Sequence, residues 1–132
     1  MKIIHGNLLH AEADVIVNPA NSFLRHGGGL AKVIADAAVG TDQRTIEAQT
    51  WLAEQVQHPN IPTGGVGVTG AGALPYKGII HAVGPIWGGG AYHEESLLAR
   101  AHLDAFEMCI ERGWKSVAVP AISCGIFGFP VK

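Results

Sequence analysis

The sequence contains little cysteine, little charge and no long apolar run, and each shortage narrows the classes of protein to consider. Two cysteines in 132 residues supply neither a disulfide framework nor a Cys-x-x-Cys metal clamp. The formal net charge is −2, so broad binding to a phosphate backbone is not expected as the main activity. No apolar run reaches the ~18–20 residues that span a bilayer, and the first residues turn polar too early for a signal peptide. We therefore expect a soluble, cytoplasmic protein with neither a membrane nor a nucleic acid as its partner.

Hydrophobic residues are plentiful at 48%, and a chain of 132 residues is long enough for one domain with a substantial core. Short β-rich runs alternate with segments whose apolar residues recur at helical spacing. The expected strands cover residues 1–5, 14–18, 65–69, 78–83 and 115–120, and the expected helices cover residues 30–40, 45–56 and 94–111. This alternation predicts an α/β domain with a largely parallel sheet.

Glycine is the unusual residue, because its 18 copies gather in clusters that follow strand-like segments. Glycine lets the backbone approach a ligand closely, although a single cluster is also ordinary turn punctuation. The pattern Gly65-x-Gly67-x-x-Gly70 matches a dinucleotide-binding fingerprint in its letters. That fingerprint needs a strand, a turn and then a helix, whereas these glycines lie in an expected strand with no helical pattern after it. We therefore discount dinucleotide binding at this segment.

The most informative segment is residues 18–30, which begins where a buried strand ends. Open α/β sheets place their ligands at the carboxyl ends of strands. Asn21 has both an acceptor and donors, which suits a ribose hydroxyl. Residues 27–29 are three glycines that lead directly into a helix, and their N–H groups together with the helix dipole favour a phosphate. The alternative is that the asparagines are turn residues and that the glycines only make the backbone of the loop flexible.

A second segment, residues 119–130, also follows an expected strand and contains glycine without charge. The backbone N–H groups of Ser123, Gly125 and Ile126 can serve a second phosphate, and Phe127 offers an apolar or stacking face. Two anion-binding loops at one edge of a sheet indicate a diphosphate as the ligand group.

Five motifs follow one another along nearly the whole chain. They are Asn18-Pro19-Ala20-Asn21, His26-Gly27-Gly28-Gly29-Leu30-Ala31, residues 64–74, His81-Ala82-Val83-Gly84-Pro85 and residues 120–128. Taken together, these motifs resemble the macro domain, a family that binds ADP-ribose, and are most similar to its viral and archaeal type. The resemblance implies a three-layer α/β/α fold with a mixed sheet and a cleft at the strand carboxyl ends.

The resemblance also implies which residues form the site. Asn21 matches an asparagine that, in members that hydrolyse ADP-ribose esters, positions the reacting ribose and a water. His26 matches a histidine of viral and archaeal members and joins Asn21 as a catalytic residue, although it can equally be a histidine that packs within a loop. The implied ligand-binding residues are Asn7, Leu8, Asn18, Gly27, Gly28, Gly29, Leu30, Ser123, Cys124, Gly125, Ile126 and Phe127.

The implied function is binding of ADP-ribose or an ADP-ribosylated protein, with hydrolysis of mono-ADP-ribosyl or O-acetyl-ADP-ribose esters. The alternative is a non-catalytic reader module that retains the same ligand. No obvious general base is present, so catalysis would depend on positioning and on stabilising charge in the transition state. No cofactor is expected, and the seven histidines show no metal-ligand spacing, so no metal is expected.

The chain departs from the family pattern at three places. Asn7 stands where an aspartate usually accepts the adenine amino group, so adenine selectivity is expected to be reduced but not abolished. Ala31 stands where one hydrolase branch has an aspartate that assists catalysis. Family members usually continue for about 40 residues beyond the equivalent of Lys132, so residues 1–132 are expected to be a single macro-like domain that lacks about 40 C-terminal residues. Either the chain is a fragment of a longer one, which we favour, or another chain covers the gap.

A third hypothesis concerns Cys124, which could act as a nucleophile with His81 as its base. No sequence signature marks such an activated thiol. His81 lies in an apolar strand, where a structural role is the more frequent outcome for a histidine.

Overall fold

The computed structural model describes residues 2–4, 12–20, 24, 29–42, 44–55, 61–85, 89 and 93–119, with the backbone alone at 2–4, 29, 30 and 47. Its strands are β1 (Lys2–Ile4), β2 (Val15–Pro19), β3 (Val66–Thr69), β4 (Gly78–Ala82) and β5 (Ser116–Ala118). Its helices are α1 (Gly29–Val39), α2 (Ile46–Gln55) and α3 (Glu94–Arg112). Each expected element that falls on described residues is therefore present, with ends that differ by one or two residues.

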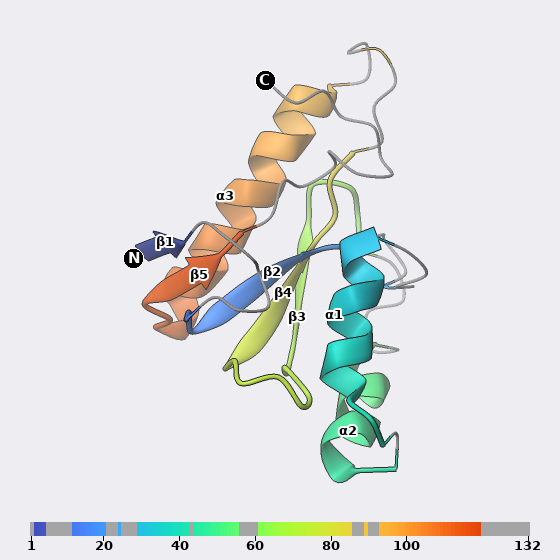
Figure 1. The fold of residues 1–132 in the computed structure, drawn as a ribbon. Coiled ribbons are helices and arrows are strands. Elements are labelled where there is room, and N and C mark those ends of the chain that lie inside the picture. Colours follow the sequence, from blue (N-terminus) through green and yellow to red (C-terminus); the bar gives the residue numbers. More distant parts are fainter. Residues whose placement is uncertain are drawn as a thin grey trace.

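The five strands form one sheet in the order β1-β5-β2-β4-β3. β1, β5, β2 and β4 pair in parallel, and β3 pairs antiparallel with β4. The sheet is therefore mixed and largely parallel, as predicted. Parallel pairing brings the carboxyl ends of β2, β4 and β5 to one edge, which we call the carboxyl edge. In Figure 1, α1 begins close to the end of β2, and α3 also begins toward this edge.

Alternate side chains of the central strands pack against helices on opposite faces of the sheet. Val15 and Val17 of β2 belong to a buried cluster with Ala101, Ala105 and Cys109, which recur every four residues along α3. Ile16, between the two valines, belongs to a second cluster that contains Ile34 of α1 and Trp51 of α2. Because side chains alternate along a strand, one hydrophobic run serves both faces. The result is the predicted three-layer α/β/α arrangement, with α3 on one side and α1 and α2 on the other (Figure 1).

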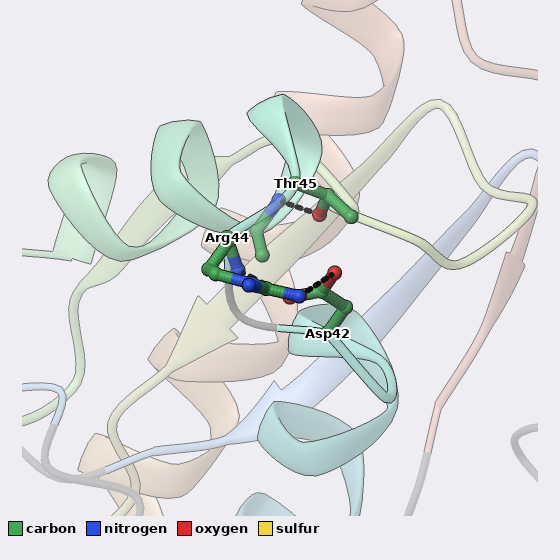
Figure 2. A network of polar contacts seen from close by, with 4 residues as sticks. Asp42, Arg44 and Thr45 are labelled. Carbon is green, nitrogen blue, oxygen red and sulfur yellow. Dashed lines mark hydrogen bonds and ion pairs between the residues drawn. The ribbon is translucent and has the colours of Figure 1, made fainter.

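The connection between α1 and α2 is closed by local polar contacts at the end of α1 far from the carboxyl edge (Figure 2). Arg44 donates from its backbone N–H and its Nε to Asp42 Oδ1, over 2.9 and 3.1 Å. These bonds to Arg44 lower the pKa of the Asp42 carboxyl. The Thr45 hydroxyl oxygen accepts the Ala48 N–H over 3.1 Å, which makes Thr45 the N-cap of α2. This cluster stabilises a helix start and lies outside the candidate site.

Asp14 ties three strands together at the opposite edge, where β2, β4 and β5 begin. Its carboxylate accepts the Lys115 N–H over 2.7 Å, and its own N–H donates to the Ser116 hydroxyl over 2.8 Å. Its carbonyl accepts the Lys77 N–H over 2.7 Å, and the Lys77 Nζ lies 3.6 Å from its carboxylate. The bond from the Lys115 backbone, followed by the charge of Lys77, holds the pKa of the Asp14 carboxyl below its ordinary value of 3.8.

This lowered pKa predicts a pH-dependent effect of Asp14→Asn. Because the pKa is lower in the folded state, the ionised carboxylate stabilises the fold above about pH 4 and loses that effect as the pH falls. The variant is therefore expected to melt at a lower temperature than the parent at pH 7, with the difference shrinking by pH 3. Thermal denaturation at both pH values tests this. Asp36→Asn, at an exposed carboxylate that pairs with Lys32 one helical turn away, is the control.

Candidate functional site

The best described part of the carboxyl edge is the end of β2, at Asn18. Pro19 follows Asn18 as the last residue of the strand, and the Ala20 N–H still donates to the Ala82 carbonyl over 3.0 Å. Asn18 lies opposite His81 of β4 in the parallel register, and both side chains are fully buried. Two polar side chains inside an apolar sheet are tolerated only where they are hydrogen-bonded.

The Asn18 and His81 side chains join Thr69 in a buried chain of hydrogen bonds. Asn18 Nδ2 lies 2.9 Å from His81 Nδ1, and His81 Nε2 lies 2.9 Å from Thr69 Oγ1. The Thr69 hydroxyl donates its own proton to the Gly70 carbonyl over 3.0 Å, so toward His81 its oxygen is the acceptor. His81 therefore carries its proton on Nε2 and accepts the Asn18 N–H at Nδ1. This arrangement fixes the rotation of the Asn18 amide and links β2 and β4 near the carboxyl edge to Thr69 of β3, which lies opposite Ile79 toward the start of β4.

The same geometry decides the role of His81. Both ring nitrogens are engaged within the sheet and the side chain is 0% exposed, so no nitrogen faces a thiol as a general base. The structural role expected for His81 is confirmed. Cys124 itself lies outside the described residues, but a Cys124 nucleophile would have to be activated by a group other than His81.

Removing the imidazole is expected to destabilise the fold. His81→Ala leaves a cavity and takes one hydrogen-bond partner each from Asn18 and Thr69, for a loss of about 2–3 kcal/mol in unfolding free energy. Urea denaturation measures the loss. Thr69→Val, which removes one hydroxyl at similar volume, is the graded comparison and should lose less. Equal stabilities of His81→Ala and the parent would contradict the assigned network.

The N-termini of α1 and α3 differ in the charge that accompanies them. The first turn of α1, which begins at Gly29, contains no acidic residue. The first turn of α3 contains Glu94 and Glu95, and Glu94 is only 1% exposed. A helix N-terminus has partial positive charge and unsatisfied N–H groups, which a carboxylate can compensate. α3 thus has acidic side chains in its own first turn, whereas α1 offers the kind of N-terminus that an external anion can bind.

The glycine-rich segment that imitates a dinucleotide fingerprint has the predicted structure. Gly67 lies within β3, and a connection over residues 70–77, made of a turn and bends, joins β3 to β4. No helix follows the strand, so the N–H groups and dipole that would bind a pyrophosphate are not provided there.

The remaining predicted site residues divide into two groups. Gly29 and Leu30 are the first two residues of α1, and Asn18 lies buried beside His81. The other predicted residues lie outside the described part of the chain: Asn7, Leu8, Asn21, His26, Gly27, Gly28, Ser123, Cys124, Gly125, Ile126 and Phe127. The ligand and catalytic roles of both groups stay predictions.

Among the described residues, no three histidine, cysteine, aspartate or glutamate side chains gather as a group that could hold a metal ion. No helix in the described part of the chain is long and apolar enough to cross a membrane.

Sequence reasoning missed two residues that support the end of β2 or the connection after it. Thr69 bonds to His81 across β3 and β4, and only the register of those strands could have revealed it. Leu24 is buried with positive φ between β2 and α1, and leucine gives no sequence signal for that conformation.

Comparisons with known proteins agree with the fold. The family model of the Macro domain matches residues 17–132. A macro domain-containing protein, TTE0995, of Caldanaerobacter subterraneus is 41% identical over 132 residues, which are all of this chain and 73% of that protein. An O-acetyl-ADP-ribose deacetylase of Enterobacter cloacae is 41% identical over 128 residues, which are 97% of this chain and 68% of that protein.

Solved structures show the same architecture. A macrodomain of Oceanobacillus iheyensis, in a structure with ADP, superposes with a TM-score of 0.78 at 34% identity over 97% of this chain and 66% of that one. The architecture and the sequence relatives together define a macro domain. The chain belongs to the macro domain family, and it spans between about two thirds and three quarters of the length of these relatives.

Proposed function

We propose that this chain binds ADP-ribose, or an ADP-ribosyl group attached to a protein, at the carboxyl edge of its sheet. The observation that supports this most directly is the start of α1, whose first turn has no acidic side chain at the edge where β2 ends. The diphosphate would accept hydrogen bonds from the backbone N–H groups of residues 27–30 on one side and of residues 123–127 on the other. The Oceanobacillus iheyensis macrodomain supports this assignment, since its structures are described as holding ADP and, in a mutant, ADPR.

We further propose that the chain hydrolyses the ester of its ligand. The Enterobacter cloacae relative, named an O-acetyl-ADP-ribose deacetylase, supports this step. In an ester hydrolysis, water adds its hydroxyl to one product and its proton to the other, which releases the free ribose hydroxyl and the free acid. Asn21 would orient the distal ribose, His26 would assist, and Phe127 would pack beside the sugar. Asn7 and Leu8 would bind the adenine end, and Asn18 would hold the end of β2 beneath the ligand.

The alternative is a reader that binds ADP-ribose without turnover, and one observation favours it. Ala31 occupies the position of the aspartate that assists one hydrolase branch, and the first turn of α1 contains no acidic residue in its place. Any hydrolysis would therefore depend on positioning and on fixed dipoles rather than on a carboxylate of α1.

Release of ADP-ribose from a mono-ADP-ribosylated protein separates the two proposals. The hydrolase predicts that the chain liberates free ADP-ribose and, in a parallel assay, acetate from O-acetyl-ADP-ribose. Tight binding of ADP-ribose with no product in either assay would select the reader. No binding at all would overturn both.

We expect the cytoplasm as the place of action, in keeping with Cys109, which is buried and free.

A further inference from the structure

Leu24 has an unusual conformation in the connection between β2 and α1. Its φ is +51°, a left-handed backbone conformation that leucine rarely adopts. His93 is the other non-glycine residue with positive φ in the described part of the chain, and it is exposed at the start of α3. Leu24 instead is only 4% exposed. A strained and buried leucine persists only where its surroundings compensate the strain.

The compensation comes from a small apolar cluster at the carboxyl edge. Leu24 packs with Ala20, Ile61 and Val83, all of which are 5% exposed or less. Ala20 follows the end of β2, Val83 follows the end of β4, and Ile61 precedes β3. The cluster is separate from the two larger cores that lie on the faces of the sheet.

Main-chain hydrogen bonds hold two members of this cluster, Ala20 and Val83, in place. The Ala20 N–H donates to the Ala82 carbonyl over 3.0 Å, and the Val83 N–H donates to the Gly65 carbonyl over 3.1 Å. The Gly64 N–H donates to the Val83 carbonyl over 2.7 Å. Ala20 and Val83 are therefore held at the ends of β2 and β4 by main-chain hydrogen bonds, and the Leu24 side chain packs on this fixed base.

Leu24 lies midway along the connection between β2 and α1, so its packing on the sheet divides that connection into two short spans. Residues 21–28 connect Ala20 to Gly29, the first residue of α1, and Leu24 divides them into spans of residues 21–23 and 25–28. Each residue extends the chain by at most about 3.6 Å, so a short span between two fixed points has few conformations. Asn21 belongs to the first span, and His26, Gly27 and Gly28 belong to the second.

We propose that Leu24 is a positioning residue that holds the connection between β2 and α1 in its ligand-binding conformation. In this proposal the Leu24 side chain packs on Ala20, Ile61 and Val83, while Asn21 and residues 26–28, on either side of it along the chain, would bind the ligand. This inference rests on the proposed function, because it assigns the precision of that same site to a buried side chain outside it.

The test compares Leu24→Ala with Ile79→Ala in the whole 132-residue chain. Both variants remove three side-chain carbons from a buried position, but Ile79 lies near the start of β4, at the other end of the strand from Val83. Calorimetric titration with ADP-ribose, well below both melting temperatures, is expected to show at least a tenfold weaker affinity for Leu24→Ala, since small misplacements in a site cost about that much or more. Ile79→Ala is expected to stay within about twofold of the parent, because its cavity lies away from the connection.

Two further variants keep the comparison decisive if Leu24→Ala does not fold. Leu24→Met retains the apolar volume and is expected to restore affinity to within about threefold of the parent. Val83→Ala weakens the packing of the cluster around Leu24 without altering the connection itself. It is expected to weaken the affinity for ADP-ribose more than Ile79→Ala does. Equal affinities of Leu24→Ala, Val83→Ala and Ile79→Ala at matched losses of melting temperature would overturn the inference.

A ligand-free measurement separates this inference from the proposed function. Amide hydrogen exchange over residues 21–28 is expected to accelerate in Leu24→Ala relative to Ile79→Ala, because the two short spans become one longer one. Unchanged exchange would overturn the anchor whether or not the chain binds ADP-ribose. Accelerated exchange in a chain whose parent binds no ADP-ribose would support the anchor and overturn the proposed function instead.

Discussion

Asn21→Ala is expected to slow the release of ADP-ribose from a mono-ADP-ribosylated protein by about 100-fold or more. The proposed site has no carboxylate in the first turn of α1, so its rate enhancement would depend on groups that orient the ribose and the attacking water. Removal of a single oriented donor at a reacting centre costs about 10²–10³ in rate where catalysis is of this kind. A single-turnover assay, with the chain in excess over the modified protein, measures the chemical step without product release.

The control for this prediction is Gln49→Ala, which removes an amide of similar chemistry from the exposed side of α2. Its rate is expected to equal that of the parent. Melting temperatures of both variants show whether either change acts through folding. If Asn21→Ala releases ADP-ribose as fast as Gln49→Ala does, the ribose is oriented by other groups and the catalytic role of Asn21 is wrong.

Gly72→Ala is expected to cost about 3 kcal/mol of unfolding free energy. Gly72 has φ +60°, and a Cβ atom there would lie 2.3 Å from the Ala38 carbonyl oxygen. That oxygen accepts the Ala73 N–H over 2.8 Å, which joins the last turn of α1 to the turn between β3 and β4. An alanine with positive φ costs about 1–2 kcal/mol, and forcing backbone apart in a packed region costs about 1–3 kcal/mol more.

Gly113→Ala is the matched control, since Gly113 has φ +71° but nothing within 4 Å of its Cβ position. Gly113→Ala therefore has the cost of the positive φ without a steric clash, and its loss of unfolding free energy is expected to be about 1 kcal/mol. Urea denaturation of both variants, with the slope compared as well as the midpoint, measures the difference. Equal losses at the two positions would contradict the close approach of Gly72 to α1.

The fold could be predicted from the sequence because local patterns determine most of it. The apolar run of β2 has side chains buried on both faces, and α3 repeats small residues every four positions along its buried side. The antiparallel direction of β3 was not predicted, because a hydrophobic run has the same appearance in either direction. The family resemblance supplied the mixed sheet, and the pairing of β3 with β4 is where it occurs.

The details of the site depend on contacts between distant residues, which patterns do not encode. The hydrogen bond from Asn18 to His81 exists because the register places the two residues opposite each other, 63 positions apart. The separate register of β3 against β4 places Thr69 diagonal to His81, so a histidine that might have been a base becomes a structural link. Leu24 follows the same principle, since its strained conformation is offset by side chains that come from three separate segments.

Titration of the chain with ADP-ribose in a calorimeter tests whether a diphosphate binds at the carboxyl edge. Saturable binding with one site per chain is expected, because the start of α1 and the segment after β5 would bind the two phosphates together. AMP and ribose 5-phosphate, which each have one phosphate and one half of the ligand, should bind at least about tenfold more weakly, since each loses the contacts of the other half. No saturable heat with ADP-ribose, or AMP binding as tightly as ADP-ribose, would contradict a diphosphate site at this edge of the sheet.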